Sequence, residues 1–533
     1  MNREHLFWLI FSIAACVLIA PLFTIDVPPI VNYPNHLARL YIIANGASDP
    51  WISHMYKHKW GIIPNIGIDL LVPWTLSFVP LHLAGRIMLA FTLIIPVIGT
   101  IAYQRALFGG NSFWPLSSFL VAYNFVFLLG FHNLLLSYGV ALLSAAIFYK
   151  TMRGNPIINT VITAACAIIT FFIHIVGLVL LIAIVSIHKL FYIVEALPNW
   201  KRVGRATFVH GCGFVIVVLG PLALYLASPL AATPSANLWI FGIDKLKFLL
   251  SPVLNYYPIL DLITAGCLIV IYIACITSGR IIISPPVSVL AAAMFIVYPY
   301  LPFGTKTATY VDVRFVVFLG FLIFCVFVPR ELPRPMMLAI SISLISLFLL
   351  RTGVVARVWY DQRQDLADLR QTIKPIEPGS RVLVVDVPGR EGDISKRGDD
   401  PALQPGVRIG RYLSIIETQT YWHIASLVLI ERHAFWPLLF SSDSQQPLIV
   451  LPPYKEISVP NGNLPFYQGL ALNDIPPEQL KRFPYIANWR SLFDYVLVVN
   501  AGVAGDLRNF LPDRLEFLNQ TGFAALFRIK KKG

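Results

Sequence analysis

The sequence has 533 residues, of which 57% are hydrophobic and only 13% are charged, and its formal net charge is +13. Soluble globular proteins carry about 25% charged residues, so this composition excludes a soluble enzyme as the main body of the chain. Repeated apolar runs of about 20 residues predict a polytopic α-helical membrane protein, because helices and closed barrels satisfy their backbone hydrogen bonds in hydrocarbon. The basic charge is then explained by loops on the inner side of the membrane, and no nucleic-acid partner is predicted.

Eleven membrane spans are predicted, with the N-terminus inside and the C-terminus outside. This orientation places the basic cluster KRVGR (201–205) on the inner side, as the positive-inside rule requires. The first span has no small-residue cleavage site after it and is predicted to be a retained helix. The spans lie near 6–23, 83–102, 113–130, 134–149, 157–173, 175–194, 206–228, 258–277, 285–302, 314–328 and 335–350.

The first polar stretch of the chain is TIDVPPIVNYPNHLAR, residues 24–39, directly after the first apolar run. Its three prolines restrict the backbone, so Asp26 is expected on a stiff turn and not on a flexible linker. From Pro34 the pattern predicts a helix, with Asn35 as a candidate N-cap.

Asp26, His36 and Arg39 place a carboxylate, an imidazole and a guanidinium beside the predicted outer face of the membrane. On the predicted helix, Arg39 lies one turn from His36. These three residue types can take up a proton and hold an anion, so the stretch is a candidate site. The alternative is a capped loop with an arginine that reaches the membrane surface.

The rest of this first outer loop, 24–82, is predicted to lie at the membrane interface. Segment 46–60 carries three aromatic residues among basic ones, which is typical of an interfacial helix. Segment 64–80 contains Asp69 and Pro73 and is predicted as a re-entrant or interfacial helix. A full span there would move the later basic loops to the outer side.

Aspartates and histidines before residue 351 gather on the predicted outer face. Among them, His132 lies in the tight turn GFHN and His174 in the tight turn FFIHIVG. An aspartate at the centre of a span costs about 2.5–3.5 kcal/mol, so this one-sided distribution predicts a polar cavity open to the outside. Two alternatives remain: the outer loops are longer and hold more polar residues, and both histidines are core or capping residues.

The outer loop YLPFGTKTATYVDVRF, residues 300–315, carries Lys306, Asp312 and Arg314. Arg314 stands at the head of a predicted helix, where the helix dipole does not favour a cation. An arginine in this position suggests an anionic partner, either Asp312 or a phosphate group.

After residue 350 the composition becomes polar, and a small extracytoplasmic α/β domain is predicted for 351–533, after a transmembrane domain at 1–350. His423 and His433 have no metal-ligand spacing partners and are interpreted as structural. The six cysteines fall in apolar runs and form no metal or disulfide pattern. The predicted elements are helices at 359–376 and 411–430, short strands at 381–387, 447–452, 494–500 and 524–530, and a loop at 388–406.

The arrangement of these pieces resembles the GT-C superfamily of polytopic membrane glycosyltransferases, in its poorly characterised bacterial branch. The likeness covers most of the chain and is one of architecture. The features that carry it are the acid in DVPPIVNYPNHLAR after the first helix, the interfacial pieces 46–60 and 64–80, the outer turns with His132 and His174, the loop YVDVRF (310–315), and a C-terminal domain with FDYVLVV (493–499).

The resemblance implies a sugar donor linked to a polyprenyl phosphate, and an acid in the first outer loop that serves as base or metal ligand. Asp26 would be that catalytic acid. Many members have a second acid beside it, whereas the neighbours here are Ile25 and Val27. No metal ligand is therefore assigned, and a divalent cation stays open.

The remaining candidate residues would bind the substrate. Arginine forks onto phosphate oxygens and lysine acts as a point charge. The groups assigned to the departing phosphate are His36, Arg39, Lys306 and Arg314, with His132, His174 and Asp312 in the same site.

The sequence therefore predicts a hexosyl- or pentosyltransferase in the inner (plasma) membrane. It would move a sugar from a polyprenyl-phosphate-linked donor to a lipid or glycan acceptor on the outer face, in contact with membrane lipids. The alternatives are a transporter or flippase of a lipid-linked or anionic solute, and a non-catalytic membrane-anchored binding or assembly protein.

Overall fold

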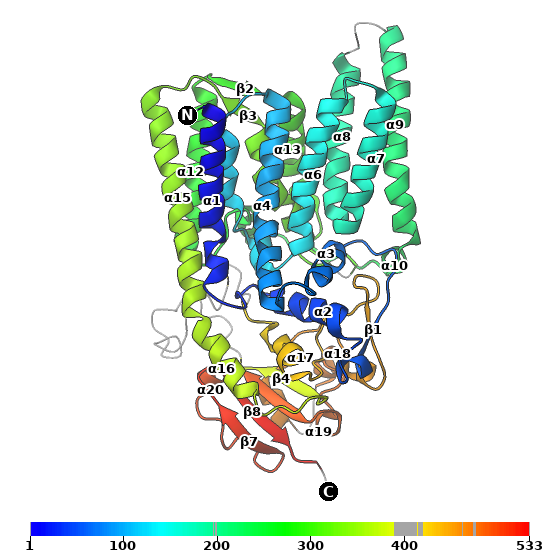
Figure 1. Cartoon of the computed structure of the whole chain (residues 1–533), viewed down its shortest axis with the longest axis vertical. Coiled ribbons are helices and arrows are strands. Elements are labelled where there is room, and N and C mark those ends of the chain that lie inside the picture. The colour runs from blue at the N-terminus through cyan, green and yellow to red at the C-terminus, as the bar shows by residue number, and fades with distance from the viewer. Residues whose placement is uncertain are drawn as a thin grey trace. The chain divides into compact units, whose positions relative to one another are not determined.

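The computed structural model divides the chain into two compact units (Figure 1). The helical unit comprises Met1–Phe23, Gly61–Ile68 and Arg86–Ala356, and the α/β unit comprises Thr24–Trp60, Asp69–Gly85 and Arg357–Gly533. Most of the first outer loop thus packs with the C-terminal residues, although its place in the sequence put it with the transmembrane domain. The structure describes residues 2–195, 197, 200–306, 308–387, 413, 419–460, 462–472 and 476–531.

Within the described residues, eight helices are long and apolar enough to cross a membrane. Three further predicted spans coincide with shorter helices, Trp114–Leu129, Pro285–Tyr300 and α14 (Val311–Leu322), so every predicted span contains helix. The eight long helices are α1 (Arg3–Ile19), α4 (Leu81–Phe108), α6 (His132–Thr151), α7 (Pro156–Ile173), α8 (Ile175–Glu195), α9 (Trp200–Ala227), α12 (Pro258–Thr277) and α15 (Arg334–Asp361).

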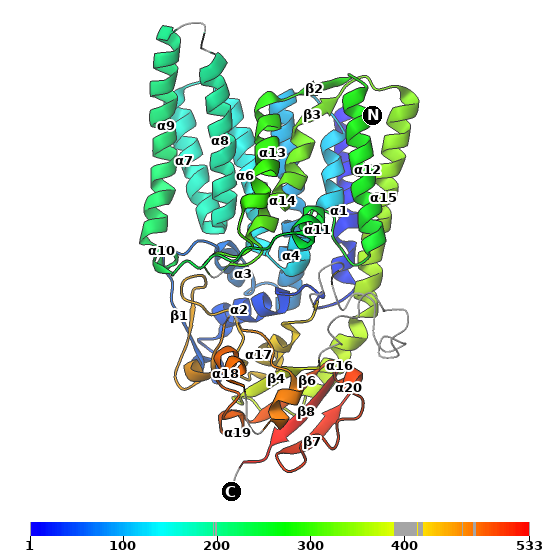
Figure 2. The ribbon, with the colours of Figure 1, turned by 180° about the vertical axis from the view of Figure 1, so that it is seen from behind.

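Helices α6, α7, α8 and α9 lie side by side in both views of the ribbon (Figure 2). Small residues let the backbones of α4, α6 and α8 approach one another. A Cβ on Gly139 would lie 2.4 Å from the side chain of Ile95, and one on Gly177 would lie 2.3 Å from the hydroxyl of Ser137. Such close contacts stabilise helix packing in a membrane, where no hydrophobic driving force acts between one helix and another.

The α/β unit contains a four-stranded sheet with the order β4-β6-β8-β7. β4 (Val382–Asp386) runs parallel to β6 (Tyr495–Val499), and β8 (Ala524–Ile529) runs antiparallel to β6 and to β7 (Leu515–Gln520). Every residue of β4 and β6 is buried, as their continuous apolar runs predict. The strands predicted at 381–387, 494–500 and 524–530 are confirmed, whereas β7 was not predicted.

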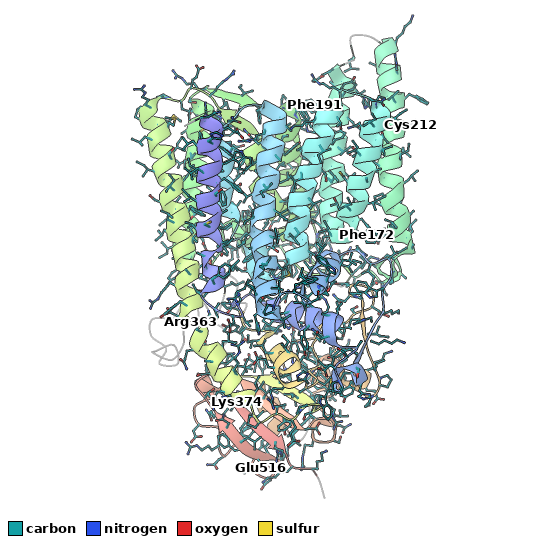
Figure 3. The ribbon with its side chains drawn as sticks, viewed as in Figure 1. Phe172, Phe191, Cys212, Arg363, Lys374 and Glu516 are labelled. Carbon is teal, nitrogen blue, oxygen red and sulfur yellow. The ribbon has the colours of Figure 1, made fainter. Side chains whose placement is uncertain are left out.

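Helix α16 (Arg363–Ile373) covers β8 with its apolar residues. Arg363 and Lys374 face solvent, as their outward side chains show in Figure 3, whereas Asp365 and Thr372 are buried. The helix predicted at 359–376 is thus confirmed as the end of α15 followed by α16. Its amphipathic pattern, with buried Leu366 and Leu369, is the reason it lies on a sheet.

The fourth predicted strand, at 447–452, is confirmed as β5 (Leu448–Val450), but it pairs with β1 (Tyr56–His58) in a separate antiparallel ribbon. The prediction of a helix at 46–60 was therefore wrong. A short 3-10 turn, η2 (Ile52–His54), precedes β1. Tyr56 stacks on Phe435, so its ring is used in packing.

Three further sequence predictions, for segments 64–80, 411–430 and 388–406, are confirmed in part or lie outside the described residues. Segment 64–80 contains the short helix α3 (Gly67–Thr75), which confirms a helix there. For 411–430, residues 411–412 and 414–418 lie outside the described residues, and α17 (Leu427–Arg432) occupies the end of the range. The predicted loop at 388–406 lies entirely outside them.

Helix α2 (Tyr33–Asn45) begins before Asn35, so the prediction of Asn35 as its N-cap was wrong. The side chain of Asn35 is buried and turns to another part of the unit. It donates to the carbonyl of Leu438 at 2.9 Å and accepts from the amide of Phe440 at 2.8 Å. Because a buried amide needs partners, this bond ties α2 to a loop some 400 residues away, and no local pattern could show it.

The shorter elements complete the fold. They are η1 (Ala20–Phe23), η3 (Trp114–Val121), α5 (Phe125–Leu129), α10 (Pro229–Ala232), α11 (Ile243–Lys247), η4 (Phe248–Leu250), β2 (Ile281–Ile283), α13 (Pro285–Val297), η5 (Tyr298–Tyr300), η6 (Ile323–Cys325), β3 (Phe327–Pro329), η9 (Ile424–Ser426), η10 (Tyr454–Ile457), η11 (Tyr467–Ala471), α18 (Pro477–Arg482), α19 (Trp489–Leu492) and α20 (Ala501–Ala504). β2 and β3 pair antiparallel at the end of the helical unit that carries the N-terminus.

Candidate functional site

Arg314, in the first turn of α14, is the best-defined candidate in the helical unit. Its side chain is buried, with a residue exposure of 9%. The guanidinium donates to the carbonyl of Thr309 at 2.9 Å, lies 3.4 Å from Nε2 of His174, and stacks over the ring of Phe131 at 4.8 Å. None of these three contacts is with a carboxylate, although the charge of Asp312 acts on the guanidinium from beyond ion-pair distance.

His174 lies between α7 and α8, outside both helices. Burial, and then the neighbouring Arg314 cation, lowers the pKa of His174 well below its ordinary value. The imidazole is therefore neutral at physiological pH and offers a nitrogen lone pair to the guanidinium. The structure thus brings together His174 and Arg314, which are 140 residues apart.

Asp312 does not form the local ion pair that was one explanation for Arg314. Its carboxylate instead accepts from Nζ of Lys245 at 2.6 Å, and both side chains are buried. Lys245 also donates to the carbonyl of Leu301 at 2.6 Å. Within residues 200–306 and 308–387, the negative charge of Asp312 therefore already has a cation of its own.

Lys306 holds together two loops of the helical unit. Its ammonium group donates to the carbonyls of Leu230, Ala231 and Thr233 at 3.0, 3.2 and 3.0 Å. These carbonyls lie at the end of the short helix α10, where a cation is favoured. An ammonium has three donors, and all three are used here, so Lys306 has none left for a ligand.

His132 is buried at the start of α6, where its ring lies edge-on to Phe127. The next residue, Asn133, positions a loop of the same unit. It accepts from the amide of Ile68 at 2.8 Å and donates to the carbonyl of Asn65 at 2.7 Å. Asn133 was not singled out in the sequence, because nothing in GFHN indicates a bond to residues 65 positions earlier.

In the α/β unit, Asp26 lies in an ion cluster centred on Arg370. Nη1 of Arg370 donates to Asp26 at 3.0 Å, and its Nε donates to Glu431 at 2.9 Å. The side chain of Asp26 is 50% exposed, so one arginine orients it while solvent still reaches it. Arg370 lies 344 residues further along the chain and was not predicted as a partner.

Arg39 and Asp69 form a buried, two-point ion pair in the same unit. Nε of Arg39 donates to Oδ1 at 2.7 Å and Nη2 donates to Oδ2 at 3.1 Å, and the two side chains are 1% and 0% exposed. His36, one turn before Arg39, packs against Phe440 with ring centroids 5.4 Å apart. His36 and Arg39 therefore both attach helix α2 to other segments of the α/β unit.

The two histidines interpreted as structural are buried or paired. Burial lowers the pKa of His423 to about 3, so that ring is neutral. His433 bonds through Nδ1 to Asp49 at 2.5 Å. In the described part of the chain, no group of three or more histidine, cysteine, aspartate or glutamate side chains is placed to hold a metal ion.

Asp386, at the end of β4, carries an unusual proton affinity. Burial raises the pKa of its carboxyl group from 3.8 to about 6, although Gln419 at 2.8 Å and Asn500 at 2.7 Å donate to it. Because the folded chain binds this proton more tightly than the unfolded chain, its contribution to stability is complete below about pH 4 and is lost as the pH rises through 6.

The titration of Asp386 should change the free energy of unfolding by about 3 kcal/mol, at 1.4 kcal/mol per pKa unit. We therefore expect this pH-dependent change to be absent in Asp386→Asn. Between pH 4 and pH 7 the wild type should lose unfolding free energy relative to the variant. Denaturant melts of both proteins across this range measure the difference. Curves that stay parallel in the two proteins would show that Asp386 does not titrate in this window.

Comparison with known proteins adds one structure. No family model and no curated protein matches the sequence. A solved structure, the crystal structure of ArnT from Cupriavidus metallidurans bound to undecaprenyl phosphate, is similar over 98% of both chains, with 10% identity and a TM-score of 0.46. A similarity of this degree identifies neither a substrate nor a catalytic residue.

Proposed function

We propose that this chain is a membrane glycosyltransferase that takes its sugar from a polyprenyl-phosphate-linked donor. The acceptor is a lipid or a glycan on the outer face of the inner (plasma) membrane. The observation that carries the proposal is the buried guanidinium of Arg314, which has no carboxylate within ion-pair distance among the described residues.

A buried charge is costly unless an opposite charge and hydrogen bonds compensate it. Arg314 has a carbonyl, a neutral imidazole and an aromatic ring, and its Nε has no hydrogen-bond partner in the described part of the chain. A phosphate group supplies the missing charge and accepts two parallel bonds from one guanidinium. The donor phosphate is therefore the ligand that this arrangement suits.

The contacts also separate the candidate residues by role. The three donors of Lys306 bond to carbonyls, and the charge of Arg39 is paired with Asp69, so holding the phosphate falls to Arg314, with His174 beside it. Asp26 is the proposed base, a role implied by the family resemblance. The side chain of Asp26 is 50% exposed, so solvent reaches the carboxylate.

The proposed reaction is a displacement at the anomeric carbon. The base takes the proton of the acceptor hydroxyl, whose oxygen forms the new bond to the sugar. The bond from the anomeric carbon to the phosphate oxygen breaks, and the polyprenyl phosphate leaves with the electron pair. Arg314 stabilises the negative charge that develops on that oxygen.

A transfer assay with purified protein and labelled polyprenyl-phosphate sugars tests the proposal. Asp26→Asn should lower the rate by about 100-fold or more, the usual contribution of a general base. Asp443→Asn is the matched control, because that aspartate is also exposed (59%) and paired with one basic residue, Lys59. The control should keep the wild-type rate.

Two outcomes would contradict the proposal at different levels. An active Asp26→Asn variant would remove Asp26 as the base and leave the transferase function intact. Failure of the wild type to consume any donor, together with movement of the intact lipid-linked sugar across proteoliposomes, would favour a flippase.

A further inference from the structure

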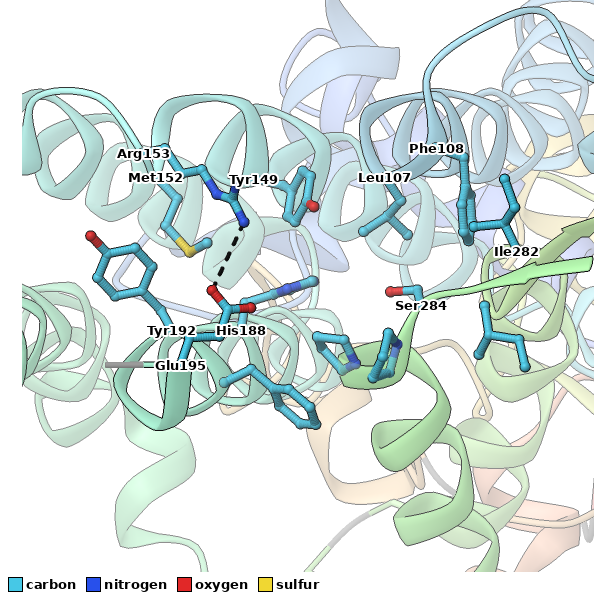
Figure 4. Close-up of a pocket in the computed structure, with 14 residues that line it drawn as sticks. Leu107, Phe108, Tyr149, Met152, Arg153, His188, Tyr192, Glu195, Ile282 and Ser284 are labelled. Atoms are coloured by element: carbon cyan, nitrogen blue, oxygen red, sulfur yellow. Dashed lines mark ion pairs between the residues drawn. The ribbon is translucent and has the colours of Figure 1, made fainter. Parts of the chain in front are cut away.

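A cavity lies in the helical unit, at the end that carries the N-terminus (Figure 4). Its volume is about 190 Å³. It is formed by the C-terminal ends of α4, α6 and α8 together with β2 and the first residues of α13. Neither Arg314 nor His174 lines this cavity, so it is separate from the candidate phosphate site.

The formally charged side chains that line the cavity are one cation and one anion. Arg153 at the end of α6 and Glu195 at the end of α8 face each other across the opening, 4.0 Å apart (Figure 4). Their side chains are 71% and 64% exposed, so this is a loose surface pair worth little to the fold. Both groups keep most of their hydrogen-bonding capacity for a ligand.

The walls are aromatic and apolar. Tyr149 and Tyr192 lie beside the charged pair, and Phe108 with Ile282 lies on the other side of the cavity. The ring of His188 closes the inner side and shares a hydrogen bond of 2.6 Å with the hydroxyl of Tyr103. Aromatic faces attract an ammonium group, and an apolar wall accommodates carbon chains.

The surface around the opening is apolar as well. Ile147 on α6, Leu190 on α8 and Ile283 on β2 are exposed hydrophobic residues on the elements that form the cavity. α6 and α8 are also long and apolar enough to cross a membrane, so these side chains face acyl chains if the helices span it. A ligand with a small polar head and hydrocarbon tails matches this combination.

We propose that this cavity binds the head group of a zwitterionic aminoalkyl phospholipid, such as phosphatidylethanolamine. The phosphate binds Arg153, and the ammonium binds Glu195 and the ring of Tyr192. Glu195 repels a purely anionic ligand, and Arg153 repels a purely cationic one. A ligand with both charges satisfies both residues, and its tails lie on the exposed apolar surface. This inference does not depend on the proposed transfer reaction.

Native mass spectrometry of the full-length protein in detergent tests the assignment. The protein is equilibrated with equal amounts of phosphatidylethanolamine and phosphatidylglycerol of the same acyl composition. We expect preferential retention of phosphatidylethanolamine, and Glu195→Gln should reduce this preference by about fivefold, the upper range for one exposed charge pair. Arg153→Ala should reduce retention of both lipids.

Lys150→Ala is the matched control, because Lys150 is a basic residue one turn from Arg153 that does not line the cavity. It should bind lipid as the wild type does. All these side chains are exposed, so the variants are expected to fold. Equal retention of the two lipids by wild type and Glu195→Gln would overturn the proposal.

A second arm uses O-phosphoethanolamine, the same head group without tails. It should compete only at concentrations far above those of the lipid, since the tails contribute through the apolar surface. Competition by the free head group as effective as that by the lipid would overturn the lipid assignment and indicate a soluble metabolite.

Discussion

Asp69→Asn is expected to lower the free energy of unfolding of the α/β unit by about 3–5 kcal/mol, the usual cost of removing one member of a buried ion pair. Arg39 would keep its charge, with a side chain that is 1% exposed, and lose its counter-charge and one of its two hydrogen bonds, because the amide nitrogen of asparagine cannot accept. Asparagine preserves the volume of the side chain, so the loss reports the charge and not a cavity. Thermal unfolding of the purified protein in detergent measures it.

The matched control for this variant is Asp361→Asn, which breaks an exposed ion pair with Arg357 in the same chain. It should leave the melting temperature nearly unchanged. The double variant Arg39→Met, Asp69→Leu should recover most of the loss, because apolar residues of similar volume can replace a buried pair. Equal melting temperatures for the Asp69 and Asp361 variants would show that the buried pair contributes no more than the exposed one.

Arg314→Ala is expected to lower the rate of sugar transfer by about 100-fold or more, the range found when one donor to a developing negative charge is removed. Arg314→Lys should recover part of this loss, since lysine restores the charge but not the two-point geometry. Initial rates at several donor concentrations measure both variants. The loss should appear in kcat as well as in KM, because the phosphate gains charge as the bond breaks.

Arg330→Ala provides the control in the helical unit, because this arginine is exposed and lies outside α14, directly after β3. It should transfer at the wild-type rate. A rise in KM for Arg314→Ala with unchanged kcat would mean that Arg314 binds the donor without stabilising the departing phosphate. Wild-type kinetics in that variant would remove Arg314 from the site altogether.

The sequence predicted what depends on local pattern. Apolar runs of spanning length and the strands at 381–387 and 494–500 are read from consecutive residues. The structure confirms the strands, and among the described residues eight of the helices are long and apolar enough to cross a membrane. The helix at 46–60 failed because the aromatic pattern of an interfacial helix also suits a short strand. Tyr56–His58 became a strand only because Leu448–Val450 is available to pair with it.

The charged partners could not be predicted for the same reason. Asp312 pairs with Lys245 and Asp26 with Arg370, at separations of 67 and 344 residues. Which cation reaches a carboxylate is decided by tertiary packing, and a single sequence contains no measure of it. The residue types of the candidate site were therefore predictable, whereas the use of Lys306 to hold a loop was not.

Because Tyr56 pairs with Val450, strand β1 cannot pair until the ribosome has synthesised β5. At the usual elongation rate of 5–20 residues per second, the ribosome needs about 20 to 80 s to reach the second strand after making the first. During that interval the early segment has been translated and its partner does not yet exist. A chaperone that shields nascent strand edges would have this period in which to act, and premature termination would leave the edge permanently open.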